Sequence, residues 1–360
     1  MSGSVSKKSK KKAGWKKYQL QTKTRHKINL GLYVLLLIVG LVVLGKLITF
    51  TTGLTKPYSP DLEETGKNYN WNGNSTLNLV VKSQELFVLS FNPASKTMVA
   101  IKIPEDTYLD LPFNFGRWPA RSIYDLGQAE KPPLGAALLK ATITTSFDLP
   151  VDGYVVTSGN FADLSTEEVL EKLRKEPLGG FNLLRQSRSD LSFWEMMQLL
   201  LKVRGVRGDK VKITDLGQSP ITKSLLLADG SRVLGIDSLR LDQFLSDQIH
   251  DSLMEESDLT IGIFNATDHP QLAEKAARMV TNMGGRVIFT ANASLRRQDS
   301  LVSGPASYTT TRLAQVFAPY CLKDPCANSE GDPVLSSSRA EANVVLGEDF
   351  FLKTVQRPGI

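Results

Sequence analysis

The hydrophobic pattern of the chain begins with one long apolar run and continues with much shorter ones. From Ile28 to Gly45, eighteen residues pass without a charge or a proline, and residues 47–52 prolong the run beyond Lys46. A helix that spans a bilayer needs about 20 mostly apolar residues, and a lysine near its end can extend to the headgroups. The alternatives are a buried core helix and a cleaved signal peptide, whose apolar region is shorter and ends at a small-residue cleavage site. We therefore predict an uncleaved signal anchor with a transmembrane helix at residues 28–50.

The charges beside this run predict its orientation. Ten Lys and Arg side chains, and no Asp or Glu, precede Ile28, and basic flanks stay in the cytoplasm. Residues 1–27 are accordingly predicted to be a basic cytoplasmic tail of a single-pass protein of the cell membrane, with the bulk of the chain extracytoplasmic. Residues 51–75 are polar and contain prolines and glycines, which favours a linker. The first predicted partner is thus the lipid bilayer, through residues 28–50.

Short apolar runs separated by turn residues follow the linker and predict an α/β domain over residues 76–250. Two of its helices begin with capping boxes, Ser165 with Glu168 and Ser192 with Glu195. The apolar side chains of the second of these helices are expected to share one core face: Phe193, Trp194, Met197, Leu200 and Leu201. The predicted strands are Leu77–Val81, Leu86–Phe91, Met98–Ile103 and Gly153–Thr157. The predicted helices are Leu134–Phe147, Thr166–Lys175, Phe193–Val203 and Leu239–Ile249.

A β-α-β pattern predicts a second domain, a small α/β sandwich over residues 258–352. An apolar strand at Leu259–Phe264 precedes a helix at Gln271–Met283, whose apolar side chains recur on one side. Two glycines end that helix before the next strand, Arg286–Thr290. The remaining predicted elements are a helix at Thr310–Tyr320 and a closing strand at Ala342–Leu346.

Composition removes several classes of function. The 360 residues carry 43 Lys and Arg against 37 Asp and Glu, but the tail holds ten of the basic side chains. The remaining 333 residues therefore have 33 basic and 37 acidic side chains, a net charge of −4, which argues against nucleic acid as a partner. Two cysteines and three histidines leave little for a metal site, so none is predicted. The sequence has no Gly-rich phosphate loop, no Gly-x-Ser-x-Gly and no His-Glu-x-x-His.

Two local features remain as candidates. Cys321 and Cys326 enclose four residues, and in an exported domain a disulfide between them is plausible. A pair of free thiols and a redox role stay open as alternatives. The loop after the first strand of the second domain carries polar side chains at a strand end. We predict a contact surface there with Asn265, Thr267 and His269, against the alternative of a solvated loop.

The order of elements and several local strings resemble the LytR-CpsA-Psr family of membrane-anchored bacterial envelope proteins. In the first domain, Met98-Val-Ala-Ile-Lys-Ile-Pro-Glu-Asp-Thr107 is similar to a family strand that ends in Ile-Pro-Arg-Asp-Thr, and Asp152-Gly-Tyr-Val-Val-Thr is similar to its next core strand. In the second domain, Ile261-Gly-Ile-Phe-Asn-Ala-Thr and Ala342-Asn-Val-Val-Leu-Gly-Glu-Asp resemble the LytR C-terminal domain. The resemblance implies an α/β/α sandwich. It also implies transfer of polyprenyl-pyrophosphate-linked glycopolymers to the cell wall, by a site of Arg and Asp residues with a divalent cation.

The chain departs from the family at most of those site positions. The Arg of Ile-Pro-Arg-Asp-Thr is Glu105 here, which would repel a phosphate, and an acid expected near the second strand is Gln84. Only a few residues separate the first two strands, too few for a phosphate-cradling loop. Asp106 does match the family string. With Arg117 and Arg121, which could form a cationic patch or simply a solvated surface, it is a candidate catalytic residue.

These observations predict a membrane-anchored extracytoplasmic cell-envelope protein with a degenerate transferase-like domain, which acts by binding rather than catalysis. Its expected partner is a cell-wall polymer or an envelope protein, and no cofactor is expected. The alternative is an active phosphotransferase that attaches polyprenyl-pyrophosphate-linked glycopolymers to the wall. Only this alternative would require Mg²⁺.

Overall fold

The computed structural model describes residues 36–41, 45–46, 57–59, 69–227, 230–249, 251–322 and 338–354. The described residues from 57 onward belong to one compact unit, and residues 36–41 and 45–46 belong to a separate one. Most of the predicted span at 28–50 lies outside the described residues, and the two stretches of it that are described are helical. Among the described residues, we find no helix with the length and apolar character to cross a bilayer.

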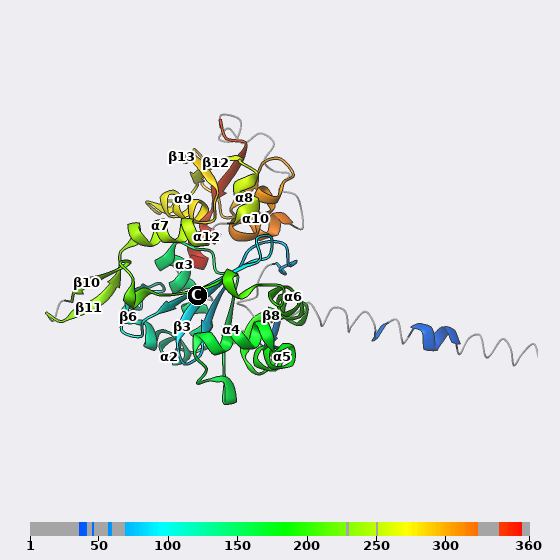
Figure 1. Ribbon diagram of the computed structural model, residues 1–360. Coiled ribbons are helices and arrows are strands. Elements are labelled where there is room, and N and C mark those ends of the chain that lie inside the picture. The colour runs from blue at the N-terminus through cyan, green and yellow to red at the C-terminus, as the bar shows by residue number, and fades with distance from the viewer. Residues whose placement is uncertain are drawn as a thin grey trace, which may run out of the picture. The chain divides into compact units, whose positions relative to one another are not determined.

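The first half of the compact unit is built on a seven-stranded mixed sheet, which we call with its helices the large-sheet part (residues 57–249; Figure 1). The strand order is β1-β8-β7-β2-β3-β4-β9. The strands β2, β4, β7 and β9 run parallel to one another, with β3 antiparallel between β2 and β4. The strand bounds are β1 Pro57–Ser59, β2 Leu77–Lys82, β3 Leu86–Asn92, β4 Thr97–Ile103, β7 Gly153–Val156, β8 Arg188–Ser192 and β9 Val211–Asp215.

Helices cover both faces of this sheet, because strands buried on both faces need an apolar layer on each side. On one face α3 and α7 pack over Val80, Val88 and Ile101. On the other face α4, α5 and α6 pack over Leu79 and Phe87. The helix bounds are α2 Ile123–Gln128, α3 Gly135–Phe147, α4 Thr166–Lys175, α5 Pro177–Gln186, α6 Phe193–Val203 and α7 Ser238–Gln248.

Both predicted capping boxes form, at the N-termini of α4 and α6. The predicted core face of α6 is confirmed only for Leu200, while Phe193 and Met197 are half-buried. Its buried apolar side chains are Met196, Leu199, Leu200 and Val203, whereas Trp194 is 53% and Leu201 64% exposed. The buried set follows the i, i+3, i+4, i+7 spacing of an amphipathic helix, and the two large exposed side chains lie outside it.

The predicted linker at residues 51–75 contributes to the fold. Pro57–Ser59 pairs with β8 as an edge strand, and Trp71 is buried among the side chains beneath α6. The backbone N–H of Trp71 donates to the buried Glu195 carboxylate at 2.6 Å, and its indole donates to the Ser75 carbonyl at 2.7 Å. Short apolar anchors in a polar stretch leave no periodic signal, so composition alone indicated a linker.

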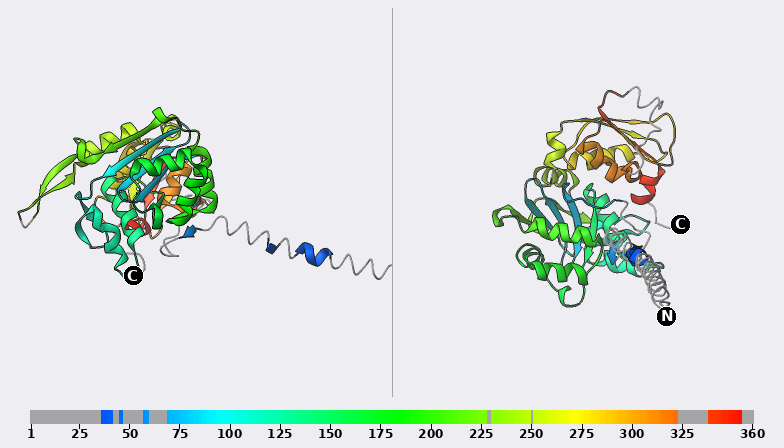
Figure 2. Two further views of the ribbon diagram at one scale, coloured as in Figure 1. Left: turned by 60° about the horizontal axis from the view of Figure 1, so that its bottom comes forward. Right: turned by 90° about the vertical axis from the view of Figure 1, so that its right-hand side faces the viewer.

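The second half is a smaller layered unit, which we call the small-sheet part (residues 251–354; Figure 2). Its four-stranded sheet has the order β13-β12-β15-β14, with β12 parallel to both neighbours and β14 antiparallel. Helices α9 and α10 pack over one face, and the buried side chains Leu272, Ala276 and Val280 of α9 confirm the predicted apolar side. The element bounds are α8 Ser252–Glu256, β12 Thr260–Asn265, α9 Leu272–Asn282, β13 Arg286–Asn292, β14 Leu301–Ser303, α10 Tyr308–Phe317, β15 Ala342–Leu346 and α12 Glu348–Thr354.

Two hairpins stand outside the sheets and were not expected from the sequence. The first joins β5 (Tyr108–Leu111) to β6 (Gly116–Pro119), and the second joins β10 (Thr222–Leu226) to β11 (Arg232–Ile236). Figure 1 shows the β10–β11 hairpin projecting from the side of the large-sheet part that carries α7. Both hairpins contribute residues to a pocket between the large-sheet part and α9.

Candidate functional site

The four parallel strands of the large sheet end at one edge, which is where open α/β sheets usually bind ligands. Lys82 at the end of β2 lies opposite Leu86, and Leu86 lies opposite Ile103 at the end of β4. The connection between β2 and β3 is a tight turn, in which the Ser83 backbone N–H donates to the Glu85 carbonyl at 3.0 Å. The geometry therefore matches the sequence expectation that no extended loop is present here.

Two of the cations at this edge, Lys102 and Arg121, are held by carboxylates. Lys102 Nζ lies 2.7 Å from Glu85 and 3.7 Å from Glu167, and Arg121 forms an ion pair with Asp106. Burial alone would raise the pKa of Glu85, but hydrogen bonds from Lys102 and Thr166 outweigh it and hold that pKa below its usual range. The hydrogen bond that Lys102 donates to Glu85 also raises the pKa of Lys102. We call these five charged side chains the strand-end cluster: Glu85, Lys102, Asp106, Arg121 and Glu167.

The three predicted catalytic candidates do not converge. Asp106 and Arg121 pair with each other, while Arg117 lies on β6 and forms a two-point ion pair with Asp110 of β5, at 2.8 and 2.9 Å. Hydrogen bonding to Asp110 raises the pKa of Arg117. Glu105 accepts the backbone N–H of Arg121 through its own carbonyl oxygen. Glu105 thus lies next to Arg121, which is already paired with Asp106.

The predicted contact loop of the small-sheet part is held by hydrogen bonds between its own residues. Asn265 Oδ1 accepts from the backbone N–H and hydroxyl of Thr267, and Asn265 Nδ2 donates to the His269 carbonyl at 2.8 Å. His269 Nε2 lies 3.0 Å from a Glu348 carboxylate oxygen, and its ring stacks on Phe351. The three predicted residues therefore lie together, and these bonds order the loop. Their use as a contact surface stays a prediction.

The predicted disulfide falls partly outside the described residues. Cys321 is disulfide-bonded, and Cys326, the other cysteine of the sequence, is not among the residues described. For metals, the described residues contain no group of three or more His, Cys, Asp or Glu side chains arranged to hold an ion.

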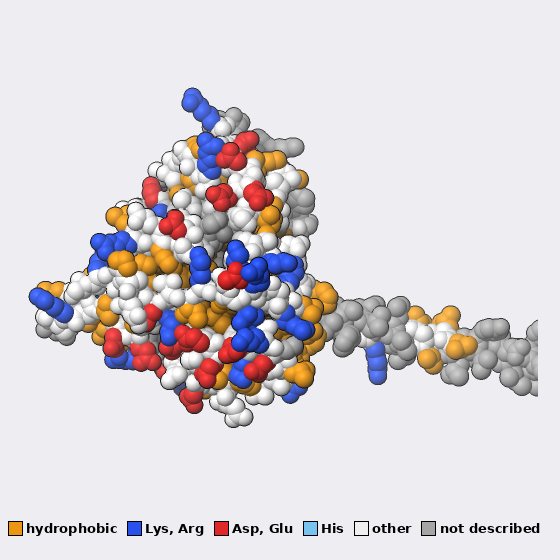
Figure 3. Space-filling view, in the orientation of Figure 1, with side chains coloured by type: hydrophobic (Ala, Val, Ile, Leu, Met, Phe, Trp, Pro, Cys, Tyr) orange, Lys and Arg blue, Asp and Glu red, His pale blue; other side chains and the backbone are white. Residues whose placement is uncertain are grey.

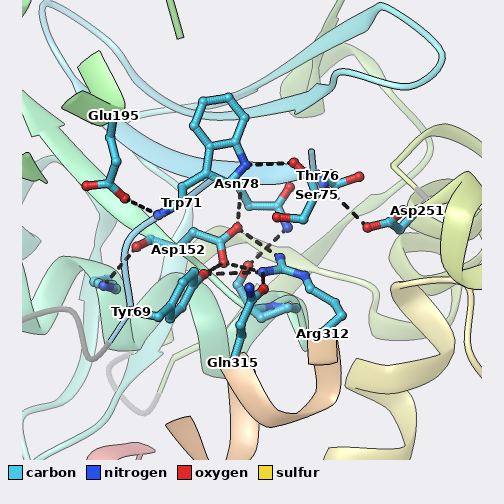
Figure 4. A network of polar contacts seen from close by, with 12 residues as sticks. Tyr69, Trp71, Ser75, Thr76, Asn78, Asp152, Glu195, Asp251, Arg312 and Gln315 are labelled. Atoms are coloured by element: carbon cyan, nitrogen blue, oxygen red, sulfur yellow. Dashed lines mark hydrogen bonds and ion pairs between the residues drawn. The ribbon is translucent and has the colours of Figure 1, made fainter. Parts of the chain in front are cut away.

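A buried polar network that the sequence did not indicate joins the two parts (Figure 4). Arg312 of α10 donates to both carboxylate oxygens of Asp152, which directly precedes β7, at 2.9 and 3.0 Å. Both side chains are only 2% exposed. Tyr69 hydrogen-bonds to Asp152 and accepts from Arg312, and the Asn78 backbone N–H donates to Asp152 at 2.8 Å. We call these four residues the Arg312 network.

The charges of this network stabilise one another and hold the two parts of the molecule together. Burial would raise the pKa of Asp152, but attraction and hydrogen bonding by Arg312 hold it below its usual range. Burial, reinforced by Asp152, raises the pKa of Tyr69 well above its usual range. Asp152 is thus charged and Tyr69 neutral at neutral pH. All three groups hydrogen-bond to one another.

A second network joins the same two parts near the surface. Arg278 of α9 lies 2.9 Å from Asp148 and 2.9 Å from Asp242 of α7. Asn282, one turn along α9, donates to the Asp148 carbonyl at 3.0 Å and to the Asp242 carboxylate at 3.2 Å. Unlike Arg312, the Arg278 side chain is 42% exposed. We call these four residues the Arg278 network.

Comparison with known proteins gives a likeness of fold only. No protein-family model matches the sequence, and no curated protein matches it. The chain is similar to the solved structure of B. subtilis TagT (16% identity, TM-score 0.35, 50% of this chain and 94% of that chain) and of B. subtilis TagV (14%, 0.34, 47% and 94%). It is also similar to the LytR-CPS2A-psr family protein YwtF (TagT) with bound octaprenyl pyrophosphate lipid (15%, 0.35, 54% and 96%). TM-scores of this size describe a partial likeness of the α/β chain path and carry no information on chemistry.

Proposed function

We propose that the chain is a membrane-anchored extracytoplasmic protein of the cell envelope, which binds a wall polymer or a partner protein and does not transfer glycopolymers. The observation that carries the proposal is the strand-end cluster. Transfer from a pyrophosphate needs concentrated positive charge around the leaving group. Here Lys102 and Arg121 are each neutralised by an acid, and Glu105 adds a further negative charge.

The membrane anchor and the outward orientation rest on the sequence. The apolar run at residues 28–50 and the basic tail before it support both. Of the run, Leu36, Leu37, Ile38, Val39 and Leu41 are described, and each is at least half exposed to the surroundings of the chain. A fusion tag at each end, followed by protease treatment of intact cells after removal of any outer barrier, would test the orientation. We expect the C-terminal tag to be digested and the N-terminal tag to be protected.

Binding of a polyprenyl-pyrophosphate lipid is the direct test of the inactive site. The full chain in detergent micelles would be titrated with the lipid, with and without Mg²⁺, beside Glu105→Arg and a matched Glu256→Arg control on α8. We expect no saturable binding by the native chain or by the control. Saturable, Mg²⁺-dependent binding by the native chain would overturn the proposal and favour an active phosphotransferase. If only the Glu105→Arg variant binds the lipid, the negative charge of Glu105 is what prevents the native chain from binding it.

The binding role needs its own test. Purified wall polymer would be sedimented with the full chain, and retention of the protein would be compared with that of the basic tail and anchor alone. Retention of the full chain only is the expected result. Equal retention of the two would mean that the tail, and not the folded part, makes the contact.

A further inference from the structure

A pocket of about 470 Å³ lies where the large-sheet and small-sheet parts meet. Its walls come from the hairpins β5–β6 and β10–β11, the C-terminal end of α3, the start of α7 and one face of α9. In Figure 3, Lys and Arg side chains lie next to hydrophobic ones around α7 and the base of the β10–β11 hairpin. We call this cavity the junction pocket.

The junction pocket carries more positive than negative charge. Arg117, Lys223, Lys275 and Arg278 line it, against the carboxylates of Asp110 and Asp148. Four cations and two carboxylates leave an excess of two positive charges. Such an excess in a concave site attracts anions and raises their local concentration.

The four cationic side chains differ in how far other residues already pair with them. Arg278 is occupied, because it holds Asp148 and Asp242. Arg117 gives two of its N–H groups to Asp110, so the others remain for a ligand. Within the described part of the chain, neither Lys223 nor Lys275 has a hydrogen-bonded or ion-paired side chain, and Lys275 acts on Asp148 only by longer-range attraction. The two lysines, with the remaining N–H groups of Arg117, are thus the cations that a ligand can use.

The rest of the lining is apolar or carries hydroxyl groups. Leu109, Leu225 and Ile236 supply apolar surface, and Thr145 and Ser146 at the end of α3 supply hydroxyls. The volume is within the range of pockets that hold small organic molecules, and a lone phosphate would leave most of it empty. A sugar presents both C–H faces and hydroxyls, so an anionic sugar matches all three kinds of lining.

We propose that the junction pocket binds a phosphorylated sugar, with Lys223 and Lys275 contacting the phosphate and the apolar wall contacting the sugar ring. The Arg278 network holds α9 against the end of α3 and against α7, so it fixes the helix that carries Lys275 in the wall of the pocket. The ligand can be a free sugar phosphate or one unit of a phosphate-containing polymer. The site is separate from the strand-end cluster and does not depend on the proposed function.

The test is calorimetric titration of the full chain in detergent micelles with a hexose phosphate, inorganic phosphate and the neutral hexose. Lys223→Ala/Lys275→Ala would be compared with Arg204→Ala/Lys210→Ala, which removes the same charge from exposed positions on other elements. We expect the native chain and the control to bind the hexose phosphate alike. The pocket variant should lose affinity by about tenfold or more, because hydrogen bonds to charged groups contribute about 1.5–3 kcal/mol each. Circular dichroism would verify that both variants are folded.

Several results would overturn the assignment. The first is a native chain without saturable binding of the hexose phosphate, and the second is a pocket variant with native affinity. If the neutral hexose binds as tightly as the hexose phosphate, the pocket does not recognise the phosphate. If inorganic phosphate binds as tightly, the pocket does not recognise the sugar. A polymer of sugar phosphates could also be titrated. Tighter binding of this polymer than of the free hexose phosphate would show that the sugar phosphate is recognised as a unit of a polymer.

Discussion

The Arg312 network and the Arg278 network join the same two parts of the molecule, each around an Arg–Asp ion pair, but in different solvent environments. Arg312 and Asp152 are almost fully excluded from water, whereas Arg278 is 42% exposed. Removing one partner of a buried pair leaves an uncompensated charge, which costs about 3–5 kcal/mol, while exposed pairs contribute about 0–1 kcal/mol. The buried network therefore fixes the joint, and the exposed network shapes a pocket that a ligand can enter.

The largest effect should come from breaking the buried pair. We expect Arg312→Met to lower the free energy of unfolding by about 3–5 kcal/mol, because Asp152 would stay buried without its cation. Denaturant unfolding of the full chain in detergent would measure it. The double variant Arg312→Met/Asp152→Asn should recover most of the loss, since it leaves no buried charge. A loss below about 1 kcal/mol for the single variant would contradict a fixed joint.

A pH dependence should arise at the Arg278 network. Burial raises the pKa of Asp148 from 3.8 to about 6, even though Arg278 lowers it. The folded chain thus binds this proton more tightly than the unfolded chain. Its contribution to stability is fully present below pH 4, is lost as the pH rises to about 6 and stays lost above. The amplitude is up to about 3 kcal/mol.

Unfolding measured across pH 3.5–7.5 would check this, with Asp148→Asn as the comparison. Asparagine suits the left-handed backbone at this position, where φ is 43°. The difference in the free energy of unfolding between the native chain and the variant should therefore change with pH mainly because Asp148 titrates. Parallel curves for the two proteins would assign the pH dependence to other groups.

A smaller loss should follow when the exposed arginine is removed. We expect Arg278→Met to cost about 1–2 kcal/mol at pH 7, because Asp148 would lose its cation while water still reaches the site. Arg286→Met, which breaks an exposed pair with Asp258, is the matched control and should cost less than about 0.5 kcal/mol. If both variants lose the same amount, the Arg278 network adds nothing to the joint.

The smallest effect should be seen in the strand-end cluster. Arg121 and Asp106 are both more than half exposed, so Arg121→Ala should change the free energy of unfolding by less than about 0.5 kcal/mol. Thermal unfolding beside the native chain would measure this. A loss above about 2 kcal/mol would mean that these charges hold the edge of the sheet together and do not merely neutralise it.

The local structure of this chain could be predicted from the sequence because its signals are short-range. The capping box at Ser192 and Glu195 and the apolar stripe of α9 need only residues within two turns. The joint could not be predicted, because Asp152 and Arg312 lie 160 positions apart and neither has a local pattern that marks it as buried. For α6, two overlapping apolar stripes satisfy helical spacing, and the structure buries the one with Met196, Leu199 and Val203. The junction pocket was missed for a further reason: its hairpins and helices come together only in three dimensions.

The distance along the chain between Asp152 and Arg312 also sets an order of events during synthesis. At roughly 5–20 residues per second, a ribosome needs about 8–30 s to add the 160 residues that separate them. During that interval the large sheet can already pair its strands, since β1 to β9 all precede Arg312, but the carboxylate of Asp152 must stay hydrated. Release of that water waits for α10 (Tyr308–Phe317), which carries Arg312. The joint is therefore closed after the strands of the large sheet have been made, and a nascent chain that stops short of α10 keeps the Asp152 carboxylate hydrated where the folded protein has it buried.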